Sequence, residues 1–90
     1  MHNLRHLRYI VEAARLGSIT NASRLLRVSQ PAISAAIRTY EEEFNLRLFI
    51  RNPSRGLALT SAGRHFVNRA RELLVNAIEF ERTFEKSNDG

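Results

Sequence analysis

The 90-residue sequence contains no cysteine and no tryptophan, and only two prolines and four glycines. The lack of cysteine excludes disulfides and cysteine-ligated zinc or iron–sulfur sites, and it suits a reducing compartment. The sequence has no stretch of about 18 consecutive apolar residues, and its first residues lack the apolar core of a signal peptide. We therefore expect one small cytoplasmic domain with no membrane partner.

Acidic residues are scarce in residues 1–40, where six arginines face a single carboxylate, that of Glu12. Cations and acids balance over the rest of the chain, so the net charge of +5 lies in this first part. Thirteen of the fourteen cations are arginine, whose rigid fork of donors suits phosphate and the edge of guanine. The charge pattern favours a polyanionic partner; a solvated basic surface without a partner is the alternative.

Apolar residues at three- and four-residue steps predict two short amphipathic helices at the start of the chain. Gly17 is expected to end the first helix in the left-handed conformation, and Ser18 to cap the second, from about residue 19 to residue 27. The recurring apolar positions of the first helix are Leu4, Leu7, Ile10, Val11 and Ala14. The second helix is expected to bury Ala22, Leu25 and Leu26.

A third helix is predicted to begin in the stretch VSQPAISAAIR, with Ser29 as its N-cap and Asn45 at its end. Pro31 is tolerated because first-turn amides have no acceptor within the helix, and those free amides suit a phosphate. One face carries Ile33, Ile37, Tyr40 and Phe44, and the exposed flank carries Pro31, Ser34, Ala35 and Arg38. Two helices joined by so tight a turn, the second with this small polar edge, predict a helix-turn-helix.

Residues 48–50 and 57–59 form two apolar runs around a turn sequence rich in Pro, Ser and Gly, which predicts a β-hairpin. An isolated hairpin is unstable, so we expect it to lie against the helices as a wing. Arg51 and Arg55 lie at its tip. The predicted fold class is therefore mostly α: a winged helix-turn-helix of three helices and a hairpin, followed by one long helix.

The long helix is predicted from Thr60, its cap, to about Lys86, and it carries two adjacent apolar stripes. The first stripe, here called the seam, has a 3.5-residue period and consists of Phe66, Ala70, Leu73, Ala77, Phe80 and Phe84. The second consists of Val67, Leu74 and Ile78. One helix cannot bury both stripes against so small a body, so we expect one to pack on its own domain and the seam on a second copy. The alternative is that both belong to the core of a single chain.

These elements divide the chain into a winged helix-turn-helix at residues 1–60 and a linker or dimerisation helix at residues 61–87. Residues 88–90 are expected to form a disordered tail or the start of a hinge to a further domain.

The ordered set of residues around VSQPAIS resembles the N-terminal DNA-binding segment of LysR-type transcriptional regulators of bacteria. The matching positions are 4–14, 17–20, 22, 25–26, 28–34, 48–49, 51, 55–60 and 62–63. The resemblance implies a linker helix that pairs antiparallel with that of a second copy. It also implies that a small-molecule effector binds only through a further domain absent from this chain. The chain is then expected to be a truncated piece of a longer protein, and a short natural protein is the alternative.

The resemblance places the groove-reading residues of the family at Gln30, Pro31, Ser34 and Ala35. The Gln30 amide can bond N6 and N7 of adenine as a bidentate pair, Pro31 suits a methyl or a sugar, and Ser34 suits a base or a phosphate. The family often has arginine at position 35, whereas alanine can touch a thymine methyl but donates no hydrogen bond. The specificity carried there is expected to be absent, or to pass to Arg38 or Gln30.

The expected contacts to the DNA backbone and minor groove lie at Ser29, Arg38, Arg55, Ser18, Thr20 and Arg5. The resemblance assigns Ser29 and Arg38 to the backbone and Arg55 to the wing, where a narrow minor groove has the strongest negative potential. The other three are expected to touch phosphates through side chains or helix-end amides, although capping alone also explains Ser18.

We expect the chain to bind double-stranded DNA sequence-specifically as a dimer for transcription control. A sequence-indifferent architectural DNA binder and a winged-helix dimerisation module are the alternatives. No enzymatic activity is expected, because the acidic run at residues 41–43 has no histidine or nucleophile around it. His2 and His6 are one helical turn apart, but no third ligand lies near them, so no metal and no cofactor are expected.

Overall fold

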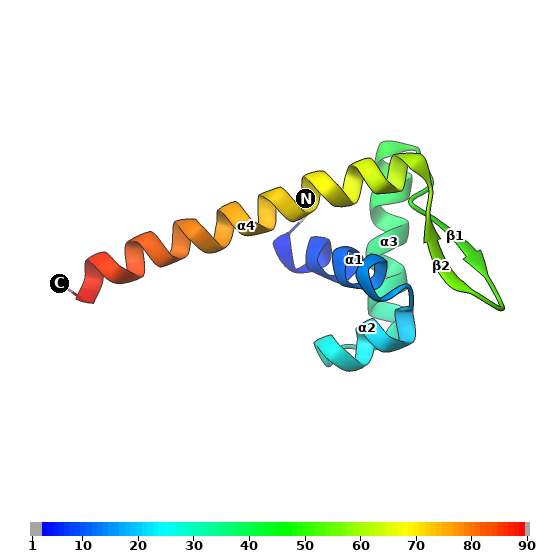
Figure 1. The fold of residues 1–90 in the computed structure, drawn as a ribbon, viewed down its shortest axis with the longest axis horizontal. Helices are drawn as coiled ribbons and strands as arrows, with labels where there is room; N and C mark the ends of the chain where they lie inside the picture. Colours follow the sequence, from blue (N-terminus) through cyan, green and yellow to red (C-terminus); the bar gives the residue numbers. More distant parts are fainter. Residues whose placement is uncertain (1–2, 90) are drawn as a thin grey trace.

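The computed structural model describes residues 3–89, with side chains placed for residues 3–85. Within them lie α1 (Leu4–Leu16), α2 (Ile19–Leu26), α3 (Gln30–Phe44), β1 (Phe49–Asn52), β2 (Gly56–Leu59) and α4 (Ser61–Asp89). Figure 1 shows the first three helices grouped beneath the start of α4, the two strands at one side, and the rest of α4 extending away from them. The predicted winged helix-turn-helix with a long final helix is confirmed.

Most helix ends follow the predicted capping residues. Gly17 and Asn45 each end a helix in the left-handed conformation, with φ angles of 64° and 51°. The hydroxyl oxygens of Ser18 and Ser29 each accept a hydrogen bond from the amide three residues further on, at 3.0 and 3.1 Å. Each bond satisfies an amide that has no acceptor within its own helix.

Two helix ends differ from the prediction. α2 ends at Leu26, and Arg27 takes the left-handed conformation at its C-cap with a φ of 58°, which costs a residue with a Cβ about 1–2 kcal/mol. α4 continues beyond Lys86 as far as Asp89. The backbone of the predicted tail at residues 88–90 is therefore helical through residue 89, and Gly90 lies outside the described residues.

α1 lies at the centre of the core and packs against α2, α3 and α4. The core residues are Leu7, Tyr9, Ile10, Val11, Ala13, Ala22, Ile33, Ala36, Ile37, Tyr40, Leu48, Phe49, Val67 and Ala70. The predicted burial of Leu25 is wrong, because its side chain is 55% exposed. The inward side of α2 carries Ala22 and Ser23, and Leu26 projects between these two when viewed down the helix axis. Leu25 projects about 100° away from Leu26, outside this inward side.

The wing is an antiparallel pair in which Phe49 faces Leu59 and Asn52 faces Gly56. The strands reach further than predicted, so residues 53–55 alone form the loop between them. At the tip, the Asn52 side-chain oxygen accepts hydrogen bonds from the amide and the hydroxyl of Ser54, at 3.0 and 2.9 Å. The side chain of Asn52 thus holds the turn that the Pro/Ser/Gly composition predicted.

The base of the wing is joined to the turn between α1 and α2. The amide of Leu57 donates a hydrogen bond to the carbonyl oxygen of Gly17 at 3.1 Å. At Gly56, where φ is 81°, a Cβ atom would lie only 2.5 Å from that same oxygen. Only glycine combines this φ with so close an approach of two backbones.

Leu48 joins α3, the wing and α4. Its amide donates to the Glu41 carboxylate at 2.8 Å, and its carbonyl oxygen accepts from the amide of Thr60 at 3.0 Å. The Thr60 hydroxyl oxygen in turn accepts from the amide of Gly63 at 2.8 Å, which confirms Thr60 as the cap of α4. A Cβ atom on Gly63 would overlap the Leu48 carbonyl, so α4 begins in backbone contact with the chain before β1.

Gly63→Ala tests this contact, because helix propensity predicts a higher free energy of unfolding and packing predicts a lower one. Alanine normally stabilises a helix interior by about 0.5–1 kcal/mol relative to glycine. Here the new methyl meets the backbone of Leu48 rather than a side chain that can move, so we expect the free energy of unfolding to fall by about 1–3 kcal/mol. Urea unfolding measures it.

Ala62→Gly, on the exposed side of the same turn, is the matched control and should cost about 1 kcal/mol through propensity alone. A Gly63→Ala variant that is more stable than the parent would contradict the contact.

Candidate nucleic-acid interface

The start of α3 projects a small polar edge into solvent. Ser29 caps the helix, and Gln30 and Pro31 follow as its first two residues, all three exposed. Pro31 removes no helical hydrogen bond at this position, because the first four amides of a helix have no acceptor within it. The chemistry predicted from the sequence is therefore available at the surface.

Four of the predicted DNA-contacting residues line one open hollow on this edge: Gln30, Pro31, Ser34 and Arg38. Ala35 is also exposed, one residue beyond Ser34. Ile33, Ala36 and Ile37 point the other way, into the core. The helical period thus separates an apolar inner face from an outer face of small, polar and basic side chains.

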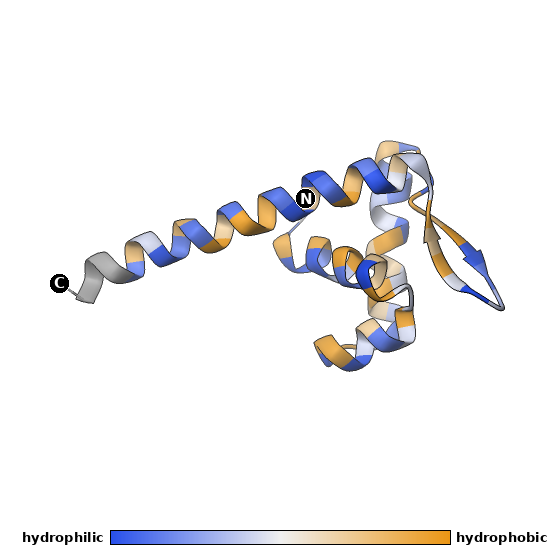
Figure 2. Ribbon diagram, in the orientation of Figure 1, coloured by the Kyte–Doolittle hydropathy of each residue, from blue (hydrophilic) through white to orange (hydrophobic). Residues whose placement is uncertain are grey.

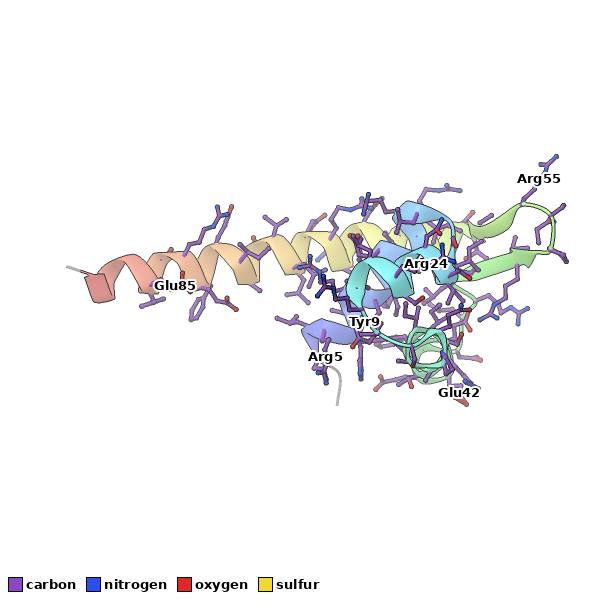
Figure 3. All side chains as sticks on the ribbon, turned by 90° about the horizontal axis from the view of Figure 1, so that it is seen from below. Arg5, Tyr9, Arg24, Glu42, Arg55 and Glu85 are labelled. Carbon is purple, nitrogen blue, oxygen red and sulfur yellow. The ribbon has the colours of Figure 1, made fainter. Side chains whose placement is uncertain are left out.

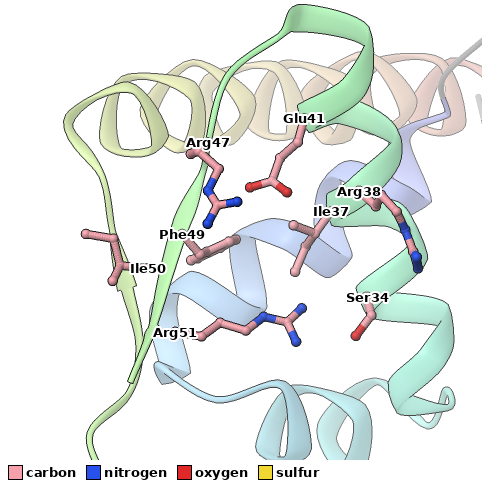
Figure 4. Close-up of a pocket in the computed structure, with 8 residues that line it drawn as sticks. All are labelled: Ser34, Ile37, Arg38, Glu41, Arg47, Phe49, Ile50 and Arg51. Carbon is pink, nitrogen blue, oxygen red and sulfur yellow. The ribbon is translucent and has the colours of Figure 1, made fainter. Parts of the chain in front are cut away.

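A second hollow of about 520 Å³ lies between α3 and β1. It is lined by Ser34, Ile37, Arg38, Glu41, Arg47, Phe49, Ile50 and Arg51. Figure 4 shows the side chains of Arg47 and Arg51 reaching from the wing side toward α3, with Ser34 and Arg38 on the helix opposite. Three arginines thus border this hollow, and its one carboxylate, that of Glu41, accepts the hydrogen bond of the Leu48 amide.

Arg51 also lines a third hollow, between the wing and the start of α2, together with Ser18 and Thr20. Arg51 therefore lies between the DNA-contacting residues predicted on α3 and those predicted at the start of α2. The sequence prediction did not assign a DNA contact to Arg47 or Arg51. The signal that could have found Arg51 is strand alternation: residues two apart share a face, and Phe49 on that face is buried against the helices.

Arg55 and Arg5 lie apart from these hollows. Arg55 is at the wing tip, and Figure 3 shows its side chain pointing outward, away from the helices. Arg5 is in the first turn of α1 and exposed, and in the same view it lies on the opposite side of the winged-helix body from Arg55. The structure therefore brings Ser18, Thr20 and Ser34 toward the wing, but not Arg5.

The capping hydroxyls remain able to donate. Ser18 and Ser29 each use an oxygen lone pair to accept a backbone hydrogen bond. A hydroxyl has one proton and two lone pairs, so the proton of each can still go to a phosphate oxygen. Capping and phosphate binding are therefore compatible at both residues, with the positive end of a helix dipole behind each.

The acid among residues 1–40 does not line these hollows. Glu12 lies on α1, where its carboxylate accepts a charged hydrogen bond from Arg15 at 2.7 Å. This bond lowers the pKa of the Glu12 carboxyl, although its partial burial acts in the opposite direction. Its charge is thus paired locally, away from the start of α3.

The described part of the chain holds no group of three His, Asp or Glu side chains placed to hold a metal ion. His2, one of the two histidines considered above, lies outside the described residues. No helix within residues 3–89 is both long enough and apolar enough to cross a membrane.

Residues 4–64 match the sequence profile of the bacterial regulatory helix-turn-helix proteins of the lysR family. The chain belongs to the LysR family. The nitrogen assimilation regulatory protein nac of Escherichia coli (strain K12) is 40% identical over 72 residues, which are 80% of this chain and 23% of that protein. The chain thus spans about a quarter of the length of the curated LysR-family relatives that it matches.

Solved structures of LysR-family domains share this architecture. The DNA-binding domain of BenM in complex with catB site 1 DNA superposes with a TM-score of 0.91 at 32% identity, covering 99% of this chain and 98% of that one. The DNA-binding domain of CbnR in complex with DNA gives a TM-score of 0.82 at 32% identity, with coverages of 97% and 95%. The described fold is therefore that of LysR-family DNA-binding domains.

Arg51→Gln tests the role of the hollow between α3 and the wing. If its guanidinium meets a phosphate, the variant should bind all duplexes more weakly, by a similar factor for each sequence. The slope of log K against log salt concentration should also become shallower by about 0.9. Fluorescence anisotropy at several salt concentrations measures both.

Arg82→Gln removes the same charge from the distal part of α4 and is the matched control. If the two variants change the slope equally, only net charge matters, and Arg51 makes no specific contact.

Proposed function

We propose that the chain recognises specific sequences in double-stranded DNA, with the start of α3 in the major groove and the wing beside it. The observation that carries the proposal is the open edge lined by Gln30, Pro31, Ser34 and Arg38, with Arg51 next to it on the wing. A helix about 10–12 Å across matches a major groove about 12 Å wide. The protein would act in the bacterial cytoplasm, as a transcription regulator.

Base recognition falls mainly to Gln30. As the first residue of α3 it is exposed, and its amide carries both a donor and an acceptor, which suits the N6 and N7 atoms of adenine. Ser34 lies one turn further on, and Pro31 offers an apolar surface to a methyl or a sugar. These short side chains let the helix backbone approach the bases closely.

Ala35 leaves the edge without a long side chain at the position where the family resemblance leads one to expect arginine. Its methyl can contact only the C5 methyl of thymine. Arg38, one turn further along the helix and exposed, would take over a phosphate contact rather than a base. We therefore propose a site in which an adenine and a thymine methyl outweigh guanine contacts.

The backbone contacts would surround this edge on two sides. Ser18, Thr20 and Ser29 offer hydroxyls near the positive ends of the α2 and α3 dipoles. On the wing, Arg51 faces the helices, whereas Arg55 points outward from the tip. In the complex, Arg55 would reach the adjacent minor groove. Arg5, on the other side of the body, would reach only a more distant phosphate.

The regulator would act as a homodimer through the seam of α4, and a small-molecule effector would act through a domain outside this chain. Within the seam, Phe66 and Ala70 are already half-buried and buried against their own domain. Leu73, Phe80 and Phe84 are 49%, 67% and 56% exposed. This contiguous apolar surface is what supports a second copy as the partner.

Gln30→Ala should weaken binding to the preferred duplex by about 1–3 kcal/mol, because a bidentate contact is lost, and relax the preference at one base pair. Selection from random duplexes, run with parent and variant, measures both effects and the spacing of half-sites. Asn68→Ala, which removes an exposed amide from α4, is the control. Identical selected sequences for parent and Gln30→Ala would remove Gln30 from base recognition.

A competition titration against unrelated duplex decides between specific and architectural binding. A sequence-specific domain should prefer its selected site by at least about a thousandfold. An equal affinity for both duplexes would instead support a sequence-indifferent binder, which needs the basic surface but neither Gln30 nor Ser34.

A further inference from the structure

The end of α2 carries two exposed arginines, Arg24 in its last turn and Arg27 at its C-cap. The sequence contains no acid between Glu12 and Glu41. Among the described residues, no hydrogen bond or ion pair occupies either guanidinium. Both positive charges are therefore available to an anionic partner outside the chain.

The backbone at Arg27 is in a conformation that glycine and asparagine adopt more readily than arginine. Its φ is 58°, and the other two described helix ends of this kind carry Gly17 and Asn45. The amides of Arg27 and Val28 both donate to the carbonyl oxygen of Ser23, the second at 3.1 Å. Backbone atoms thus hold the turn, and the guanidinium adds no bond to it. A residue kept in a strained conformation without such a contact in the fold is typical of a functional position.

Arg24 lies on the same flank of α2 as Thr20. Residues four apart share one face of a helix, and Arg24 follows Thr20 by four. Thr20 lines the hollow between the wing and the start of α2, together with Ser18 and Arg51. The dipole of α2 favours a cation anywhere in its last turn, but it does not select this flank. Arg24 therefore extends the row of residues proposed to meet phosphates by one turn.

Arg27 is also close to the edge of α3 that is proposed to enter the major groove. It precedes Ser29, the N-cap of α3, by two residues, so the two Cα atoms are at most about 7 Å apart. Figure 1 shows the end of α2 and the start of α3 together, at the end of the body farthest from the start of α4. Figure 2 shows hydrophilic positions in α2 and at the tip of the wing, both of which lie below the start of α4 in that view. A helix in the middle of a groove about 12 Å wide has a phosphate ridge about 6 Å to either side, which is within reach of this arginine.

We propose that Arg24 and Arg27 bind phosphates of the DNA backbone beside the major groove that receives α3. α2 has 8 residues and is thus about 12 Å long, and Ser18 and the wing lie at its other end. The two arginines therefore meet phosphates different from those of Ser18 and Arg51. They anchor the end of α2, whose turn leads into Gln30, and so fix how deeply α3 enters the groove. This inference rests on the proposed function and adds two binding residues to it.

Arg27→Asn should stabilise the fold and weaken DNA binding. Asparagine tolerates the left-handed conformation, so the equilibrium constant for folding should rise about threefold. Loss of the guanidinium should lower the affinity for every duplex by about five- to tenfold at about 0.1 M salt, and the slope of log K against log salt concentration should become shallower by about 0.9. Urea unfolding measures the stability of the 90-residue chain, and fluorescence anisotropy measures its affinity.

Arg24→Gln should lower the affinity and the slope by similar amounts. In the double variant with Arg27→Asn, the slope should become shallower by about 1.8, because the two arginines neutralise separate phosphates. Arg27→Lys keeps the charge in the same strained conformation, so it should keep the slope of the parent chain. A role in the fold alone predicts no change of slope for any of these variants.

Two matched controls use the same measurements. Asn45→Gly changes the left-handed residue at the other end of α3 and should leave DNA affinity unchanged. Arg82→Gln removes an equal charge from the distal part of α4, where no DNA contact is proposed. If Arg82→Gln weakens binding as much as Arg24→Gln and Arg27→Asn do, only net charge matters and the inference is overturned.

Duplexes in which single phosphates are replaced by neutral methylphosphonates locate the contacts. Replacement of the phosphate that Arg24 binds should weaken binding by the parent chain but not by Arg24→Gln. Arg51→Gln should remain sensitive at that position, because it meets a different phosphate. An Arg24→Gln variant with the same sensitive positions as the parent chain would overturn the assignment of Arg24.

The remaining outcomes separate this inference from the proposed function. If the parent chain binds its selected duplex and neither Arg24→Gln nor Arg27→Asn changes affinity or slope, the inference is overturned and the proposed function stands. A changed base preference would place the guanidiniums on bases and overturn the phosphate contacts. An Arg27→Asn variant less stable than the parent would mean that the fold itself needs the arginine, which overturns the assignment of Arg27. A parent chain that binds no duplex even at low salt overturns both the inference and the proposed function.

Discussion

The backbone of Leu48 is the point at which α3, the wing and α4 are held together. Its amide is bound by Glu41 of α3 and its carbonyl by Thr60, just before α4, while Gly63 leaves room for α4 to begin against it. One residue therefore orients the helix before it, the strand after it and the long helix that follows. A buried amide and carbonyl that are both satisfied in this way resist displacement, because each would cost about 1–3 kcal/mol to leave unpaired.

Much of this arrangement could be predicted from local patterns. The caps at Gly17, Ser18, Ser29 and Asn45 follow from backbone chemistry that acts within a few residues. The exposure of Gln30 and Pro31 follows from helical periodicity once the start of α3 is placed. The period of α4 likewise predicts two apolar stripes, and the structure places Val67 and Ala70 in the core of the single chain.

The features that could not be predicted depend on contacts between distant segments. Leu25 has the spacing of a buried residue, but α2 is short and turns a different side inward. In the sequence, Arg51 belongs to the predicted turn. In the structure it pairs with Leu57 as part of β1, and its side chain points toward α3. An apolar cavity lies where α1, α3 and α4 meet, and because three helices form its walls, no single pattern in the sequence reveals it.

The wing is anchored at one end only. At its root, Leu57 is bonded to Gly17, whereas at its tip the bonds of Ser54 and Arg55 run back to Asn52 within the same turn. Because no bond among the described residues joins the tip to α3, the tip can adjust to a narrower or wider groove while α3 keeps its position. The width of the minor groove varies with base composition, so in the proposed complex Arg55 would respond to A·T-rich flanking DNA through the shape of its groove.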